Sequence, residues 1–241
     1  MATPVVTDTH VLHEFATREE LTEALSDRLA SELDLDFSKG DFASIALSGG
    51  STPKAVLARL GEKLGPALEM VYFALVDERY VPPTDPRSNE LMIKQQLGLL
   101  EHPESEFLSL YYDGETAEDA AKLAHDKLLD DEELPFDVVT LGMGTDGHTA
   151  SFFPGGDNLA AATDPTTQTL FMPIEAPGAG EPRITMTLAP IAAARNVILH
   201  IEGAEKRAVF EKALEDGPAD DLPIRHVLRH PDVKLDVYWA P

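Results

Sequence analysis

The chain has no cysteine and few basic residues, and both shortages limit its chemistry. The absence of a thiol among its 241 residues excludes disulfides, thiolate metal sites and a cysteine nucleophile. Only 19 lysines and arginines stand against 43 acidic residues, which gives a net charge of −24. Nucleic acids and anionic membrane surfaces are bound through concentrated positive charge, so we expect neither as a partner.

Long apolar runs are also lacking. No run approaches the roughly 20 residues that cross a bilayer, and the first residues lack the basic, apolar leader of an exported protein. We therefore predict a cytoplasmic protein. Its apolar fraction of 43% is sufficient for a substantial core. Because no segment has the composition of an interdomain linker, we expect a single domain over residues 1–241, as a monomer or weak homo-oligomer.

Strand-like and helix-like segments alternate along the chain. Residues typical of helix N-termini precede apolar positions at helical spacing near Thr17, Pro53, Ser88, Thr116 and Ala204. Predicted strands cover residues 42–47, 71–76, 136–141, 169–174, 183–187, 196–201 and 235–239. Such alternation is typical of an α/β fold in which a mostly parallel sheet is covered by helices on both faces.

Three loops that are rich in polar or reactive residues follow predicted strands. They are residues 48–54, 77–79 and 142–148. In a parallel sheet the carboxyl ends of the strands meet at one edge, and ligands bind there. We therefore expect the three loops to lie together and to form the ligand site.

The loop of residues 142–148 carries the groups best suited to proton transfer. Its glycines allow a sharp turn, and it presents His148 beside Asp146. Histidine changes charge near neutral pH, so we predict that chemistry takes place at this turn.

The pattern Gly142-x-Gly-x-x-Gly147 also matches a dinucleotide-binding fingerprint, but Pro154 leaves no room for the long helix that the fingerprint needs. A structural turn with a surface histidine is the other alternative.

The loop of residues 48–54 is a candidate phosphate site. The backbone N–H groups around Gly49 and Gly50, the hydroxyls of Ser51 and Thr52 and the start of a helix would all favour an anion. The Walker A spacing is absent. A well-capped helix start without a ligand is the alternative interpretation.

Charged residues elsewhere are further candidates for binding an anion. Arg79, close to Asp77, suits a two-pronged contact with phosphate or carboxylate, although a local ion pair is the commoner arrangement. Lys206 lies in the first turn of a predicted helix, where a cation is unfavourable unless an anion is near. Arg183 is either a phosphate contact or a loop charge.

Metal ligands are not indicated. No pair of histidines has ligand spacing with a third donor nearby, so we predict no metal and no cofactor. Besides His148, the histidines follow no pattern, and we interpret them as surface or packing residues: His10, His13, His102, His125, His200, His226 and His230.

Taken together, the loops resemble those of the 6-phosphogluconolactonase family. The matching segments appear in the family's order, and they are residues 48–54, 77–79, 87–89, 142–151, 183–187 and 203–206. The resemblance implies a Rossmann-like three-layer α/β/α fold, used without a dinucleotide. It also implies hydrolysis of 6-phospho-D-glucono-1,5-lactone to 6-phospho-D-gluconate.

One position distinguishes the lactonases from a related group, the glucosamine-6-phosphate deaminases. The deaminases share the glycine loop and the Asp-Gly-His turn, but a glutamate five residues after the histidine completes a proton relay. Here that residue is Phe153. An apolar ring moves no protons, so the sequence departs from the deaminases and agrees with the lactonases. A non-catalytic sugar-phosphate sensor is a further alternative, but it would be expected to carry a DNA-binding segment and a basic surface.

The resemblance also implies roles for the candidate residues. Neutral His148 would take a proton from the water that attacks C1 of the lactone, and Asp146 would orient its imidazole. The residues that would bind the sugar or its phosphate are Gly49, Gly50, Ser51, Thr52, Asp77, Arg79, Arg183 and Lys206. Within this set, Arg79, Lys206 and the hydroxyls of residues 48–54 would hold the 6-phosphate, with Arg183 as a further candidate.

Overall fold

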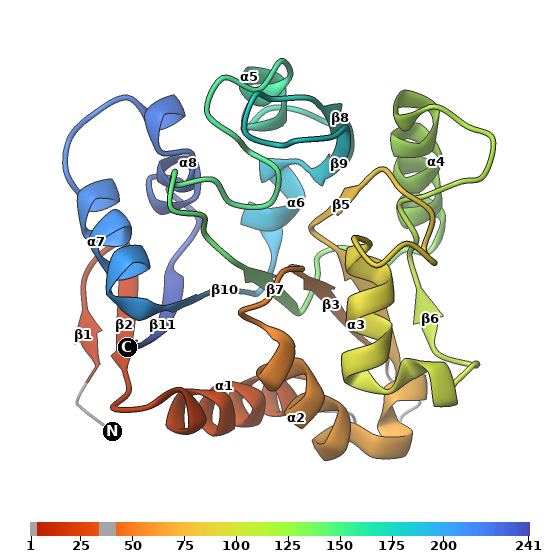
Figure 1. Cartoon of the computed structure of the whole chain (residues 1–241), viewed down its shortest axis with the longest axis horizontal. Helices are drawn as coiled ribbons and strands as arrows, with labels where there is room; N and C mark the ends of the chain where they lie inside the picture. The colour runs from red at the N-terminus through yellow and green to blue at the C-terminus, as the bar shows by residue number, and fades with distance from the viewer. Residues whose placement is uncertain (1–3, 34–41) are drawn as a thin grey trace.

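An eight-stranded sheet forms the centre of the computed structural model, which describes residues 4–33 and 42–241. The strand order is β1-β2-β11-β10-β7-β3-β4-β6 (Figure 1). Neighbouring strands are parallel, except that β1 pairs antiparallel with β2. The strands are β1 (Val5–Val6), β2 (His10–Glu14), β3 (Ala43–Leu47), β4 (Val71–Leu75), β6 (Glu106–Phe107), β7 (Val138–Leu141), β10 (Asn196–Glu202) and β11 (Leu235–Ala240).

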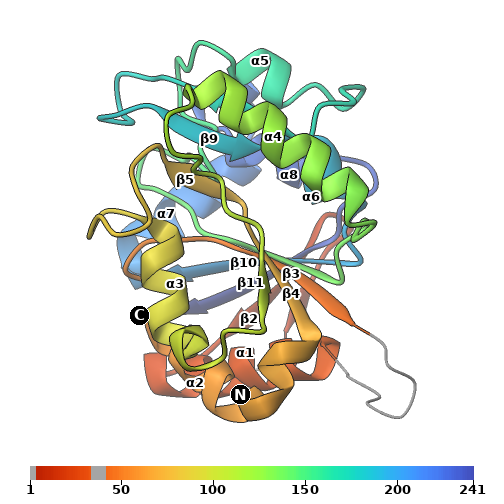
Figure 2. The ribbon, with the colours of Figure 1, turned by 90° about the vertical axis from the view of Figure 1, so that its right-hand side faces the viewer.

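Helices cover both faces of this sheet, so the structure has three layers. Figure 2 shows α1 and α2 on one side of the strands and α4, α6 and α8 on the other. The predicted α/β/α fold with a mostly parallel sheet is confirmed. The helices are α1 (Arg18–Glu32), α2 (Lys54–Leu64), α3 (Asn89–Leu97), α4 (Ala117–Asp130), α5 (Leu159–Ala162), α6 (Leu188–Ala193), α7 (Gly203–Leu214) and α8 (Ile224–Leu228).

The central strands are mostly apolar because both of their faces are buried. Every residue of β3 and of β4 is buried, as expected for strands that helices cover on both sides. On one side α1 contributes leucines at a spacing of four, and Leu21, Leu25 and Leu29 are each at most 1% exposed. This stripe is the buried helix face that the sequence predicts.

Side-chain caps set the start of several helices. The hydroxyls of Thr17, Ser88 and Thr116 each accept a hydrogen bond from a first-turn backbone N–H, at 3.1 to 3.2 Å. These bonds satisfy donors that would otherwise have no partner within the helix. The predicted helix starts at these three residues are therefore confirmed.

A second, antiparallel sheet begins directly after β4 and includes residues 77–79, which were expected to form a loop. It contains β5 (Asp77–Arg79), β9 (Arg183–Met186) and β8 (Phe171–Ile174), in that order. The strands predicted at residues 169–174 and 183–187 exist, but they join this sheet and not the parallel one. Residues 175–182, which connect them, contain no helix, and a parallel crossover needs a dozen or more residues.

Strands β1, β2 and β6, at or beside the edges of the large sheet, are missing from the sequence prediction. β1 and β6 have two residues each, and β2 begins and ends with polar residues. Very short strands and strands with polar residues are typical of sheet edges, where they discourage pairing with another chain. Such segments do not have the apolar pattern that identifies a central strand.

None of the helices within residues 4–33 and 42–241 combines the length and the apolar character that a bilayer-crossing segment needs. The first three residues, on which the expectation of no export leader partly rests, lie outside the described residues. That expectation stays a prediction.

Candidate active site

The three predicted loops surround one pocket of about 310 Å³ at the carboxyl ends of β3, β4 and β7. Ser48 ties two of the loops together, because its Oγ accepts a hydrogen bond from Gly142 N at 3.0 Å and donates one to Thr140 O at 2.8 Å. Except for Asp146, every predicted site residue lines this pocket: Gly49, Gly50, Ser51, Thr52, Asp77, Arg79, His148, Arg183 and Lys206. The loops therefore meet as the sequence predicts.

A tight turn after β7 brings the imidazole of His148 to the pocket. His148 Nδ1 lies 2.5 Å from Asp146 Oδ1, which also accepts a hydrogen bond from His148 N at 3.1 Å. The hydrogen bond from His148 holds the pKa of Asp146 below its ordinary value. Gly144 makes this packing possible, because a Cβ there would lie 2.2 Å from His148 Nδ1. With Nδ1 engaged by Asp146, Nε2 is the imidazole nitrogen left for a ligand.

The turn is followed by irregular chain before the next helix. That helix, α5, has four residues, Leu159–Ala162. A dinucleotide fingerprint places the N-terminus of a full helix directly behind its glycines, where the helix holds a pyrophosphate. The geometry after His148 therefore disagrees with the dinucleotide alternative.

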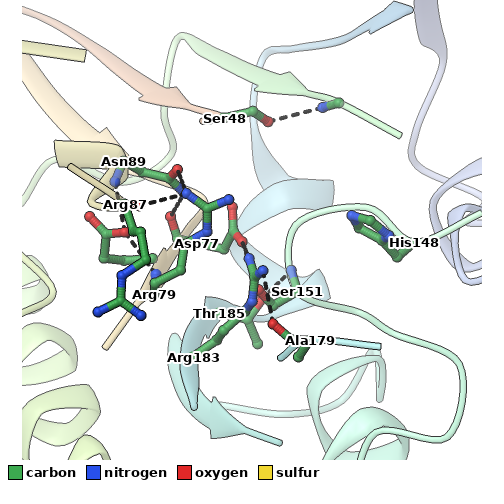
Figure 3. Close-up of polar contacts among 12 residues, drawn as sticks. Ser48, Asp77, Arg79, Arg87, Asn89, His148, Ser151, Ala179, Arg183 and Thr185 are labelled. Carbon is green, nitrogen blue, oxygen red and sulfur yellow. Dashed lines mark hydrogen bonds and ion pairs between the residues drawn. The ribbon is translucent and has the colours of Figure 1, made fainter. Parts of the chain in front are cut away.

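Arg79 and Arg183 lie directly opposite each other on the paired strands β5 and β9. Like charges in such positions repel, yet both side chains line the pocket. Arg79 Nη1 donates to Asn89 Oδ1 at 3.0 Å and to the carbonyl oxygen of Arg87 at 2.6 Å (Figure 3). The Nε of each opposed arginine is buried and finds no hydrogen-bond partner within residues 4–33 and 42–241. An anion in the pocket would compensate the two opposed charges.

One buried carboxylate balances part of this positive charge. Asp77 is 6% exposed, and its Oδ2 accepts a hydrogen bond from Ser151 Oγ at 2.6 Å and lies 3.4 Å from Arg183 Nη1. Arg183 also donates to the carbonyl oxygen of Ala179 at 3.2 Å, and burial lowers the pKa of its guanidinium. Asp77 lines the pocket, but its carboxylate is engaged by protein groups, and this arrangement indicates that it supports Arg183.

The start of α2 faces the pocket without a cap. Residues 48–53 line the pocket, and the first turn of α2 receives no side-chain capping bond. The well-capped helix start that was the alternative interpretation is therefore not found. Gly49 packs against Asn89 so closely that a Cβ would lie 1.9 Å from Asn89 Oδ1, and Gly50 has a φ of 96°. Uncapped N–H groups at a helix N-terminus favour an anion.

Lys206 brings a further cation to the pocket from α7. Burial lowers the pKa of its ammonium group, and Glu202 and Glu205 act in the opposite direction. Desolvation makes a charged group costly unless an opposite charge compensates it. An anionic ligand in the pocket would provide that compensation.

Comparison with known proteins assigns the chain to a family. The sequence profile of the family described as glucosamine-6-phosphate isomerases/6-phosphogluconolactonase matches residues 16–239. The chain belongs to this family. The resemblance found in the loop sequences is thereby confirmed.

Relatives within the family match over nearly their whole length. The chain is 44% identical to the 6-phosphogluconolactonase of Rhizobium meliloti (strain 1021) over 232 residues, which cover 95% of this chain and 98% of the relative. Over 227 residues it is 42% identical to the 6-phosphogluconolactonase of Mesorhizobium japonicum, with 94% of each chain covered. A crystal structure of a 6-phosphogluconolactonase from Shewanella baltica OS155 superposes with a TM-score of 0.86 at 34% identity, over 96% of this chain and 98% of that one.

In this member of the family, Asn89 and His200 also line the pocket. Neither is among the predicted site residues. Asn89 Nδ2 donates to Asp77 O at 2.9 Å. His200 is 5% exposed, and its Nε2 lies 3.2 Å from Glu202 Oε1. Its interpretation as a surface or packing residue is therefore incomplete. Alternate residues of a strand point to the same face, so His200 and Glu202 lie on one face of β10 beside the start of α7. This alternation is the sequence signal that could have identified His200 as a pocket residue.

Glu78 holds the arginine side of the pocket in place. It is 2% exposed, and its Oε1 accepts hydrogen bonds from the backbone N of Arg79 at 2.7 Å and of Asn89 at 2.8 Å. Its Oε2 accepts bonds from Ser88 Oγ at 2.9 Å and from Glu90 N at 2.8 Å. Burial raises the pKa of Glu78 to about 7, although these hydrogen bonds act to lower it. One side chain thus joins β5 to the start of α3.

The raised pKa of Glu78 predicts a pH dependence of stability. The folded protein keeps this proton up to about pH 7, whereas the ordinary value is 4.5. Folding therefore takes up a proton between these values, and the stability that this uptake contributes is lost as the pH rises through the window. We expect Glu78→Gln, measured by thermal unfolding at pH 5 and pH 8, to lose less stability across the window than the wild type.

Glu118→Gln is the matched control, because it removes the same charge from an exposed position on α4. Its change in melting temperature between the two pH values should follow that of the wild type. An equal pH response in all three proteins would contradict a raised pKa at Glu78.

Proposed function

We propose that the protein hydrolyses 6-phospho-D-glucono-1,5-lactone to 6-phospho-D-gluconate, the second step of the oxidative pentose phosphate pathway. The names of its relatives from Rhizobium meliloti and Mesorhizobium japonicum support this substrate. The observation that carries the proposal is that a hydrogen-bonded imidazole and several cationic donors line the same pocket. One end of such a pocket suits a phosphate, and the other suits an ester under attack by water.

In the proposed mechanism His148 is the general base. Its Nδ1 donates to Asp146, so Nε2 carries a free electron pair that can take a proton from water. The resulting hydroxide forms a bond to C1 of the lactone, and the carbonyl electrons move to the oxygen of a tetrahedral intermediate. When the intermediate collapses, the bond from C1 to the ring oxygen breaks, and the imidazolium returns its proton to that oxygen. Asp146 stabilises the imidazolium between these steps.

The phosphate end is proposed to lie among the cationic groups and the start of α2. Arg79 and Lys206 would hold the 6-phosphate together with Ser51 and Thr52, and Arg183 would add a donor. The N–H groups next to Gly49 and Gly50 and the guanidinium groups of the two arginines would supply directed hydrogen bonds. Asp77 contributes by supporting Arg183.

The deaminase alternative is disfavoured by the surroundings of His148. Phe153 is 3% exposed, and its ring stacks on the imidazole with a centroid separation of 4.2 Å. The imidazole therefore has one acidic partner, Asp146, and an apolar neighbour at the position of the deaminase glutamate. This arrangement supports a reaction that needs a single relayed proton.

Replacing the proposed base tests the mechanism. We expect His148→Ala to lower kcat for the phosphorylated lactone by about 10² to 10⁴, the usual contribution of a positioned base. The measurement is a coupled assay with freshly prepared lactone, with circular dichroism to check the fold. His226→Ala is the control, because it removes another histidine paired with an aspartate, Asp220, away from the pocket. Turnover close to the wild-type rate in His148→Ala would remove His148 from the mechanism.

Truncating the proposed phosphate ligands tests the substrate. Arg79→Ala and Lys206→Ala should each lower kcat/KM for the phosphorylated lactone about 10- to 100-fold, since a hydrogen bond to a charged group is lost. Hydrolysis of unphosphorylated glucono-1,5-lactone should change far less. Lys212→Ala, which removes the same charge from an exposed position on α7, is the control. An equal loss for both lactones would contradict a phosphate role.

A further inference from the structure

Phe153 contacts two charged or chargeable side chains of the pocket at once. Its ring stacks on the imidazole of His148, with centroids 4.2 Å apart and planes inclined by 27°. The guanidinium carbon of Arg183 lies 5.0 Å from the centroid of the same ring. Phe153 is 3% exposed and lines the pocket. A buried ring therefore lies in contact with both the proposed base and a proposed anion ligand.

The hydrogen bond to Asp146 does not by itself fix the imidazole of His148. The side chains of His148 and Asp146 are 31% and 45% exposed, and a single bond at Nδ1 leaves the ring free to turn about that bond. Contact with a flat apolar surface removes this freedom, because one face of the imidazole must then lie along the surface. The bond and the stacking together determine where Nε2 points.

The ring of Phe153 is itself held firmly. Phe153 N donates to Ser151 O at 2.9 Å, and Phe153 O accepts a bond from Gly156 N at 3.0 Å. Gly178, in the segment of residues 175–182, lies beside the ring, where a Cβ would make an ordinary van der Waals contact of 3.6 Å with Phe153 Cδ1. Ser151 is in turn bonded to Asp77, which pairs with Arg183. The surface on which the imidazole rests is thus part of the buried network that positions Arg183.

We propose that Phe153 is a positioning residue for His148. Its ring fixes the plane of the imidazole. The same aromatic ring also attracts the cationic guanidinium of Arg183. The imidazolium that forms during turnover gains from the same ring for the same reason. A base and an anion-binding cation can therefore share one small pocket. This inference rests on the proposed role of His148 as the base.

Kinetics of Phe153→Leu and Phe153→Tyr test the proposal. Leucine fills much of the space but offers no flat face, so kcat for the phosphorylated lactone should fall about 10-fold or more through misplacement of the base. KM should change less than kcat, because Arg79, Lys206, Ser51 and Thr52 are untouched and Arg183 keeps its contacts with Asp77 and Ala179. Phe153→Tyr retains the ring and should keep most of the wild-type kcat.

Phe152→Leu is the matched control. Phe152 is fully buried next to Phe153, but its ring makes no stacking contact with His148 within the described part of the chain. We expect Phe152→Leu to lower the melting temperature at least as much as Phe153→Leu does while kcat is retained. An equal loss of kcat in the two leucine variants would overturn the proposal, because the loss would then follow general destabilisation.

The imidazole resonances of His148 give a readout that does not depend on turnover. Ring current from Phe153 should place its C–H signals upfield, and they are assigned as the signals that disappear in His148→Ala. In Phe153→Leu these signals should move downfield, whereas in Phe152→Leu they should stay in place. Unchanged His148 signals in Phe153→Leu would overturn the proposal.

Failure of this inference can be told apart from failure of the proposed function. If the wild type does not hydrolyse the lactone, the proposed function is wrong, and the inference falls with it as a statement about catalysis. If the wild type is active and His148→Ala is not, but Phe153→Leu keeps the wild-type kcat, the inference alone is wrong.

Discussion

The site depends on positive charge being held in a protein whose net charge is −24. Arg79 and Arg183 face each other across β5 and β9, an arrangement that costs free energy in the absence of an anion. Two buried acidic side chains support it: Asp77 pairs with the guanidinium of Arg183, and Glu78 holds the backbone of Arg79 in place. At physiological salt, the effect of charges more than about 8 Å away is largely screened. The contacts of Asp77 and Glu78, and not the acidic surface, therefore determine how strongly the pocket would attract an anion.

The topology of the small sheet explains how these arginines come together. The chain leaves β4 and passes almost directly into β5, so Arg79 is carried just beyond the carboxyl edge of the large sheet. More than a hundred positions later, β9 returns antiparallel and places Arg183 opposite. Glu78 then ties this corner to the first turn of α3. The pocket is therefore built where the two sheets and the starts of α2, α3 and α7 meet.

The parts predictable from the sequence are those controlled by local pattern. Buried strands such as β3 and capped helices such as the one after Thr116 are specified by consecutive residues, and the meeting of the loops follows from parallel pairing. The opposition of Arg79 and Arg183 depends on pairing between distant strands, which no local pattern encodes. The bond between His148 and Asp146 depends on the geometry of the turn. Whether His200 lines a pocket depends on which segments of the chain cover β10. The single-domain organisation and the cytoplasmic location stay predictions.

Within a family whose description includes both isomerases and lactonases, the chemistry must be set by details of the pocket and not by the fold. A 6-phosphate is common to the sugars named in the family description, so the cationic groups that we propose to bind it do not explain the difference. The surroundings of His148 differ from those expected in an isomerase. In this chain the imidazole of His148 has one carboxylate at Nδ1 and an apolar ring on its face, which fits the proposed transfer of a single proton from water to a leaving oxygen. A lactone is a reactive ester that opens with that single relay. A reaction at an amino sugar requires protons at further positions, and Phe153 supplies none of them.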